Sequence, residues 1–154
     1  MKSPNRLLLG LGLAIAALAI IAIGLVLFIP KTVSLLPEDT PEGTVQRFLL
    51  AVQEKDYPKA FTYLNLVEAG KTVTYSDWVR DIPAPFTSTQ SSWKATLGRS
   101  TVSGNNASVE VLIDTFRPNG PFGSSTYTQQ FNFQLTKTGN SWFITSRPPL
   151  YWLY

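Results

Sequence analysis

Histidine and cysteine are both absent from this chain of 154 residues. Their absence excludes zinc sites built on Cys or His, His-based proton shuttles, Cys nucleophiles, haem attachment motifs and disulfides. Charged residues are also sparse, at 15% of the chain. Because these common carriers of catalysis and metal binding are missing, we predict neither an enzyme nor a bound cofactor or metal.

A long apolar run occupies residues 7–29, which contain only Leu, Ile, Ala, Val, Phe and Gly. As a helix it would span about 34 Å, and a bilayer's hydrocarbon core needs roughly 20 such residues. A cleaved signal peptide has a shorter apolar region with small residues at the cut, whereas Pro30 follows this run. The pattern predicts a retained transmembrane helix, in which Gly10 and Ala14 form a small-residue pair suited to helix packing.

The formal net charge of +3 lies entirely beside this apolar run. Lys2, Arg6 and Lys31 flank the run, whereas residues 32–154 hold as many basic as acidic residues. The positive-inside rule then predicts a single-pass protein of the plasma (inner) membrane, with residues 1–6 as a cytoplasmic tail and the C-terminal domain outside. The neutral body argues against a nucleic acid as partner. The expected partners are the lipid bilayer and other membrane-complex subunits or a homo-oligomer.

Helical signals follow a linker at residues 30–40. The segment 40–42 (Thr-Pro-Glu) combines an N-cap residue, a proline in the first turn and an acid near the helix start. Apolar residues then recur at i, i+3, i+4 and i+7 from Val45. Asp56 can cap a second helix, and residues 76–82 form a short third one that ends before a proline.

Alternating apolar and polar residues then predict strands, separated by turn signals at Gly104 and Gly139. Four stretches show this pattern: 93–97, 107–113, 127–135 and 142–144. Helices followed by antiparallel strands indicate an α+β fold. We predict an N-terminal transmembrane helix followed by about three helices packed on a curved antiparallel sheet of about four strands.

The sequence PEGTVQRFLLAVQEKDYPKAFTYLN, with the later SDWVRDI and SWFITSRPPLYW, resembles nuclear transport factor two-like domains of the cystatin-like cone superfamily. The resemblance covers about residues 38–152 and implies such a domain over 41–154. It implies a curved sheet wrapped by helices, with a pocket at the wide mouth of the cone. Domains of this kind serve as enzymes, ligand binders, dimerisation modules and scaffolds, so the fold does not define the function. Membrane-anchored examples look mostly like assembly or accessory parts of envelope machines.

Aromatic side chains supply the candidate binding sites. The C-terminal sequence PPLYWLY places apolar or aromatic residues at a chain end that is usually polar, namely Leu150, Tyr151, Trp152, Leu153 and Tyr154. They could fold back over the domain, dock on a partner protein or lie at the bilayer interface. Deleting residues 150–154 distinguishes these options, because lost stability supports folding back and lost complex assembly with an intact fold supports docking.

Two other motifs are weak. The Gly-Lys-Thr at 70–72 lacks the first glycine of a phosphate-binding loop, and we expect a polar helix-to-loop connection there. Asp77 and Asp81 share a helix face, which we expect to be solvated rather than catalytic.

The predicted function is a single-pass, membrane-anchored, extracytoplasmic interaction module, an accessory or assembly subunit of a membrane protein complex. The alternative is a domain that binds a small hydrophobic ligand in an aromatic cone pocket lined by Trp93, Phe131 and Trp142. An enzyme is the least expected class, because the sequence offers no poised base.

Overall fold

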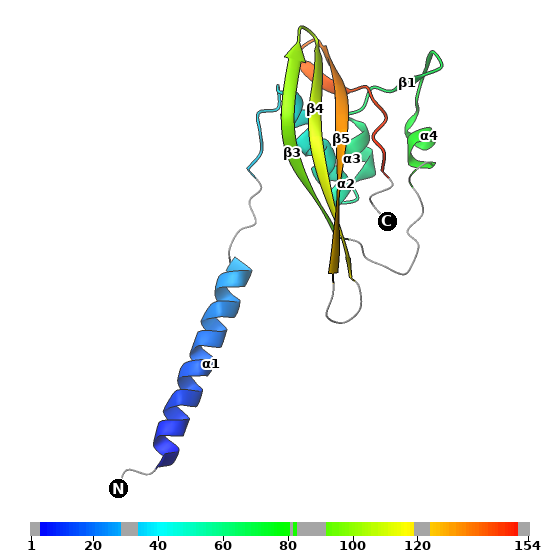
Figure 1. The fold of residues 1–154 in the computed structure, drawn as a ribbon. Helices are drawn as coiled ribbons and strands as arrows, with labels where there is room; N and C mark the ends of the chain where they lie inside the picture. Colours follow the sequence, from blue (N-terminus) through cyan, green and yellow to red (C-terminus); the bar gives the residue numbers. More distant parts are fainter. Residues whose placement is uncertain (1–3, 29–33, 81, 83–91, 119–123, 151–154) are drawn as a thin grey trace. The chain divides into compact units, whose positions relative to one another are not determined.

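The computed structural model describes residues 4–28, 34–80, 82, 92–118 and 124–150 (Figure 1). The chain divides into two compact units, Met1–Ser34 and Leu35–Tyr154.

The described residues of the first unit include the helix α1 (Pro4–Phe28). Among the described residues, however, no helix is both long enough and apolar enough to cross a membrane. This finding contradicts the predicted transmembrane helix at 7–29. It equally contradicts the predicted single-pass placement in the plasma (inner) membrane, with its cytoplasmic tail and external domain.

The predicted packing pair of the first unit lies on α1. Gly10 and Ala14 are one turn apart, and both are exposed. A Cβ added at Gly10 would meet nothing within 4 Å. The packing role of this pair therefore stays a prediction.

The second unit has the predicted α+β composition. Its described helices are α2 (Pro41–Gln53), α3 (Tyr57–Phe61) and α4 (Tyr75–Arg80). Its main sheet consists of β3 (Ser92–Ser103), β4 (Asn106–Pro118), β5 (Ser124–Thr138) and β6 (Ser141–Ile144). These strands lie in the order β3-β4-β5-β6, and each pair of neighbours is antiparallel. The sheet is thus a simple meander with α2 and α3 behind it in Figure 1.

The predicted helix starts are confirmed. The Thr40 side chain accepts a hydrogen bond from the Gly43 N–H at 3.1 Å, and Pro41 occupies the first turn of α2. The Asp56 side chain likewise accepts from the Lys59 N–H at 3.2 Å at the start of α3. These caps satisfy N–H groups that have no partner inside the helix.

The core lies between α2 and one face of the sheet. Val45, Phe48 and Val52 of α2 are at most 1% exposed. They face the odd-numbered side chains of β4, among which Val109 and Ile113 are fully buried. Burying one such side chain stabilises the fold by about 1.5–3 kcal/mol, so this contact holds the helices to the meander.

The two edges of the sheet differ. Beyond β6, the Asn65 N–H donates to the Ile144 carbonyl and the Ile144 N–H donates to the Tyr63 carbonyl, each at 2.9 Å. The segment that follows α3 therefore covers the β6 edge. The outer edge of β3 has no such neighbour in the part of the chain that the structure describes.

Residues 35–40 are held against α2 by polar contacts. The Leu36 N–H donates to Gln46 Oε1 at 2.7 Å, and Arg47 Nη1 donates to the Leu36 carbonyl at 2.9 Å. The position of Gly43 shows how close the two segments lie, because a Cβ there would be 1.9 Å from the Pro37 carbonyl oxygen. Only glycine fits at this position without movement of the backbone.

We expect Gly43→Ala to destabilise the second unit by about 1–3 kcal/mol, since its methyl group would push residues 35–40 away from α2. The direction of the change in unfolding free energy is informative. Helix propensity alone would make Gly43→Ala stabilising by about 1 kcal/mol, so a loss of stability points to the close contact. The free energy of unfolding in urea measures the effect. Gln53→Ala, at the exposed end of α2, is the control and should change stability by less than about 0.5 kcal/mol. A Gly43→Ala protein as stable as the wild type would contradict the close contact.

Candidate functional site

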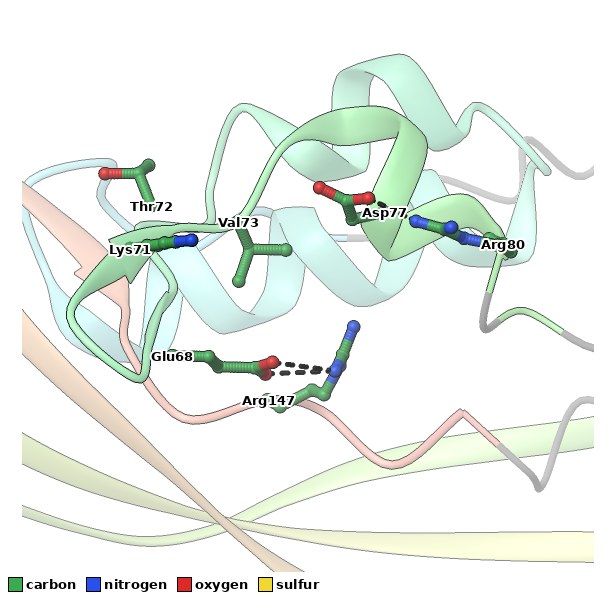
Figure 2. A pocket seen from close by; sticks show the side chains of 7 residues that line it. All are labelled: Glu68, Lys71, Thr72, Val73, Asp77, Arg80 and Arg147. Carbon is green, nitrogen blue, oxygen red and sulfur yellow. Dashed lines mark hydrogen bonds and ion pairs between the residues drawn. The ribbon is translucent and has the colours of Figure 1, made fainter.

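A cleft of about 320 Å³ opens on the surface of the second unit (Figure 2). Two stretches that are far apart in the sequence form it: residues 68–80, which comprise most of a small β-hairpin and the helix α4, and the chain that follows β6. Seven residues line it: Glu68, Lys71, Thr72, Val73, Asp77, Arg80 and Arg147. We refer to this site as the hairpin cleft.

The hairpin consists of β1 (Val67–Glu68) and β2 (Lys71–Thr72). Ala69 and Gly70 connect them with φ values of 49° and 77°, as a two-residue turn of type I′ requires. A positive φ is unfavourable for alanine, so tertiary contacts must hold the turn. The strands show that the polar helix-to-loop connection predicted here is wrong.

The base of the hairpin is anchored in the core. Leu66 and Val73, which flank the two strands, are 3% and 9% exposed. The Val73 N–H donates to the Leu66 carbonyl at 2.9 Å. Burial of both side chains fixes the hairpin to the domain, while Glu68 and Lys71 on it stay exposed.

A capping box starts α4. Thr74 Oγ1 donates to Asp77 Oδ2 at 2.6 Å and accepts from the Asp77 N–H at 3.3 Å. The bond from the Asp77 N–H satisfies one free N–H group of the helix N-terminus, and a hydrogen bond from the Thr74 backbone to the Asp77 carboxylate completes the box. The side-chain bond from Thr74 is the largest cause that lowers the pKa of Asp77, and Arg80 adds to it, whereas desolvation opposes it. Asp77 is therefore a structural carboxylate, ionised and paired with Arg80.

Trp78 connects α4 to the rest of the second unit. It is 1% exposed, and its ring centroid lies 5.7 Å from that of Phe61 and 6.5 Å from that of Phe48. Tyr57 and Tyr75 each lie at 6.4 Å from it. Burial raises the pKa of Tyr57, and Tyr75 adds to this effect. A helix as short as α4 is not stable alone, so this aromatic cluster positions its charged face at the cleft.

An ion pair links the hairpin to the chain after β6. Arg147 Nη1 lies 3.0 Å from Glu68 Oε1 and 3.1 Å from Oε2. The preceding residue is fixed to the sheet, because the Gln134 N–H donates to Ser146 Oγ at 3.0 Å. In the view of Figure 2, Val73 lies between this ion pair and the Asp77–Arg80 pair.

The charges of the hairpin cleft do not cancel. Three basic side chains face two acidic ones, and both acids are engaged by arginines. Lys71 lies opposite Glu68 in the hairpin register. Among the described residues, nevertheless, neither acid of the cleft forms an ion pair with Lys71. The cleft thus presents one lysine whose charge is not neutralised by a contact.

This arrangement fits binding better than catalysis. The charged side chains of the two ion pairs are between 35% and 70% exposed, and a general base generally needs a pKa raised toward neutrality. Asp77 has the opposite shift. Within the described part of the chain, no group of three His, Cys, Asp or Glu could hold a metal ion. An open cleft of this kind can exchange its ion pairs with a charged group on a partner.

The aromatic residues predicted for a cone pocket are not brought together. Their strand register places all three on the core-facing side of the sheet, but Trp93 lies on the edge strand β3 and Trp142 on the opposite edge strand β6. Trp93 shares its row with Tyr127, and Trp142 shares its row with Lys137. These two rows are about 33 Å apart along β5.

Phe131 borders a different and smaller cavity of about 110 Å³. The residues that line it are Phe131, Asn132, Phe133, Ser146, Pro148 and Pro149. Neither tryptophan of the predicted pocket takes part. Trp142 instead donates from Nε1 to the Asp39 carbonyl at 3.1 Å, which gives it a structural role at the start of α2.

The predicted C-terminal docking residues are described only in part. Leu150 is 8% exposed and belongs to the hydrophobic core. Tyr151, Trp152, Leu153 and Tyr154 lie outside the described residues. Asp81, which the sequence pairs with Asp77, also lies outside them.

Comparison with known proteins finds matches only among solved structures. No family model matches the chain, and a search of curated proteins finds no match. Among solved structures, a SEC-C motif containing protein from Rhodopseudomonas palustris, determined in solution, is 16% identical. The match covers 72% of this chain and 79% of that one, with a TM-score of 0.49. A likeness at this level carries no argument about function.

The comparisons contradict the predicted nuclear transport factor two-like domain, because no family model matches the chain. The features behind the resemblance explain the error. Capped amphipathic helices and alternating strands follow from general rules of helix and sheet formation, and they occur in many unrelated α+β domains. They therefore predict secondary structure without identifying a family.

The capping box predicts a specific change in the titration of Asp77. We expect Thr74→Ala to raise the Asp77 pKa toward its ordinary value, because it removes the hydrogen bond that lowers it most. Since the folded pKa is depressed, the stabilisation from this carboxylate is present above the unfolded pKa and is lost as pH falls through the folded pKa. NMR titration of the carboxyl carbon measures the shift. Thr72→Ala, in the same cleft, should leave the Asp77 pKa unchanged; an equal change in both variants would refute the assignment.

Proposed function

We propose that residues 35–154 form a protein-interaction module that recognises a partner through the hairpin cleft and serves as an accessory or assembly subunit of a protein complex. The observation that carries this proposal is that the hairpin, α4 and the distant chain after β6 meet at one open, charged cleft. Each segment is fixed to the core independently, by Leu66 and Val73, by Trp78 and by Ser146.

Such a site is suited to recognition. Its rim of exposed ion pairs is polar, and charges at a rim contribute to partner choice and association rate. Val67 on the hairpin is 60% exposed and Tyr75 on α4 is 39% exposed. These apolar side chains lie on the elements that bear the charges and could add buried area to a contact.

The competing proposal of a small hydrophobic ligand has less support. Ligand pockets usually enclose about 300–1,000 Å³ and are mostly apolar. The cavity beside Phe131 is about 110 Å³, and the larger hairpin cleft is lined mainly by charged residues. A protein partner suits an exposed charged cleft better.

A site-specific cross-linking experiment tests the proposed function. A photoreactive amino acid at Thr72, an exposed residue of the cleft, should form an adduct with one recurring protein in the cells that express the chain. The same group at Thr101, exposed on β3, is the matched control and should not form that adduct. Absence of any adduct at Thr72, or equal adducts at both positions, would contradict the proposal.

A further inference from the structure

The charge distribution within the hairpin cleft defines the chemistry of what it recognises. We propose that the cleft binds a side-chain carboxylate of an acidic peptide segment, with Lys71 as its first contact. This inference rests on the proposed function, because it names the chemical class of the partner at the same site.

Lys71 is available because its neighbours in the cleft are already engaged. Glu68, its cross-strand neighbour, is held through both carboxylate oxygens by Arg147, at 3.0 and 3.1 Å. Asp77 is held by Thr74 at 2.6 Å and by Arg80. Within the described residues, therefore, the acids of the cleft are bound elsewhere, and the Lys71 ammonium group remains open to an incoming anion.

The strained turn fixes the place of this lysine. Lys71 directly follows Ala69 and Gly70, both at positive φ, so its strand starts at a defined point of the hairpin. Val73, two residues further on, is 9% exposed and anchors that strand in the core. A charge on a short anchored strand is more restricted than one on a free loop, which reduces the entropy lost on binding.

The size of the excess charge favours a carboxylate. Three cations and two anions leave the cleft with one net positive charge, which one carboxylate neutralises. A phosphate carries close to two negative charges at neutral pH and would have to take an arginine from its existing ion pair. A nucleic acid would require a basic surface, whereas residues 32–154 have no net charge.

The two ion pairs can strengthen this contact. Arg80 and Arg147 both line the cleft, and their side chains are 70% and 35% exposed. A guanidinium group binds a carboxylate in a planar, directional geometry. A second carboxylate of an acidic segment can therefore bind Arg80 without displacing Asp77, because the exposed guanidinium group has five N–H donors.

Binding of a short oligoglutamate peptide with blocked ends to the full-length chain tests this inference. We expect amide NMR signals of residues 67–80 and 147 to shift with added peptide, and binding to weaken as salt screens the charges. Oligoglutamine of the same length is the uncharged control and should not shift them. Shifts centred elsewhere, or equal shifts with both peptides, would overturn the proposal.

Two variants isolate the role of the lysine. Lys71→Gln should weaken oligoglutamate binding about threefold to fivefold, while Lys94→Gln, an exposed lysine on β3, should leave it unchanged. Circular dichroism of both variants checks that they fold. Equal binding by the two variants would refute the assignment of Lys71.

Inorganic phosphate is the competing probe. If it shifts the same signals at lower concentration than the peptide does, the carboxylate assignment is wrong.

The inference and the proposed function can also fail separately. If a partner is cross-linked at Thr72 but oligoglutamate does not bind, the proposed interaction module is supported and the proposed acidic ligand is refuted.

Discussion

The buried ring of Trp78 is the contact on which the hairpin cleft depends. It packs against Phe48 and Phe61, and so joins the six-residue helix α4 to the helices that cover the sheet. Without that contact α4 would be too short to persist in water. The Asp77–Arg80 pair would then lose its fixed position beside the hairpin. A core residue that never reaches the cleft thus determines its geometry.

The cleft shows how a domain can carry several charged side chains at one site without a strong electrostatic field around it. Arg147 and Arg80 are each matched by an acid from their own surroundings, which lets them lie close together with little mutual repulsion. Lys71 then provides a local excess inside a body of zero net charge. Recognition at such a site relies on short-range pairing rather than on long-range attraction.

The elements predicted correctly from the sequence are those governed by local rules. Thr40 and Asp56 are N-cap residues that mark the starts of α2 and α3. The alternating pattern around Val109 and Phe133 identifies buried strand faces. The β1–β2 hairpin was not predictable in this way, because its strands have two residues each and alanine rarely occupies the first turn position. The glycine at position 70 was the one local residue that could have indicated a turn between the two strands. Alternation also identified Trp93 and Trp142 as strand residues, but it contains no information about their distance along the sheet. The contact between Glu68 and Arg147 joins distant segments, so no local pattern reveals it.

The hydrogen bonds of Tyr63 and Asn65 with Ile144, which cover the edge of β6, have a consequence for folding kinetics. The meander itself is made of consecutive hairpins, whose loops are short and close quickly. The strand β6, however, completes its hydrogen bonds only when Tyr63 and Asn65 arrive from a segment far upstream in the chain. Closing so large a loop costs more entropy than closing a hairpin. During folding, the main-chain groups at Ile144 therefore stay unprotected until the helical layer has docked, and a chaperone or a second unfolded chain has its best access to the sheet in that interval.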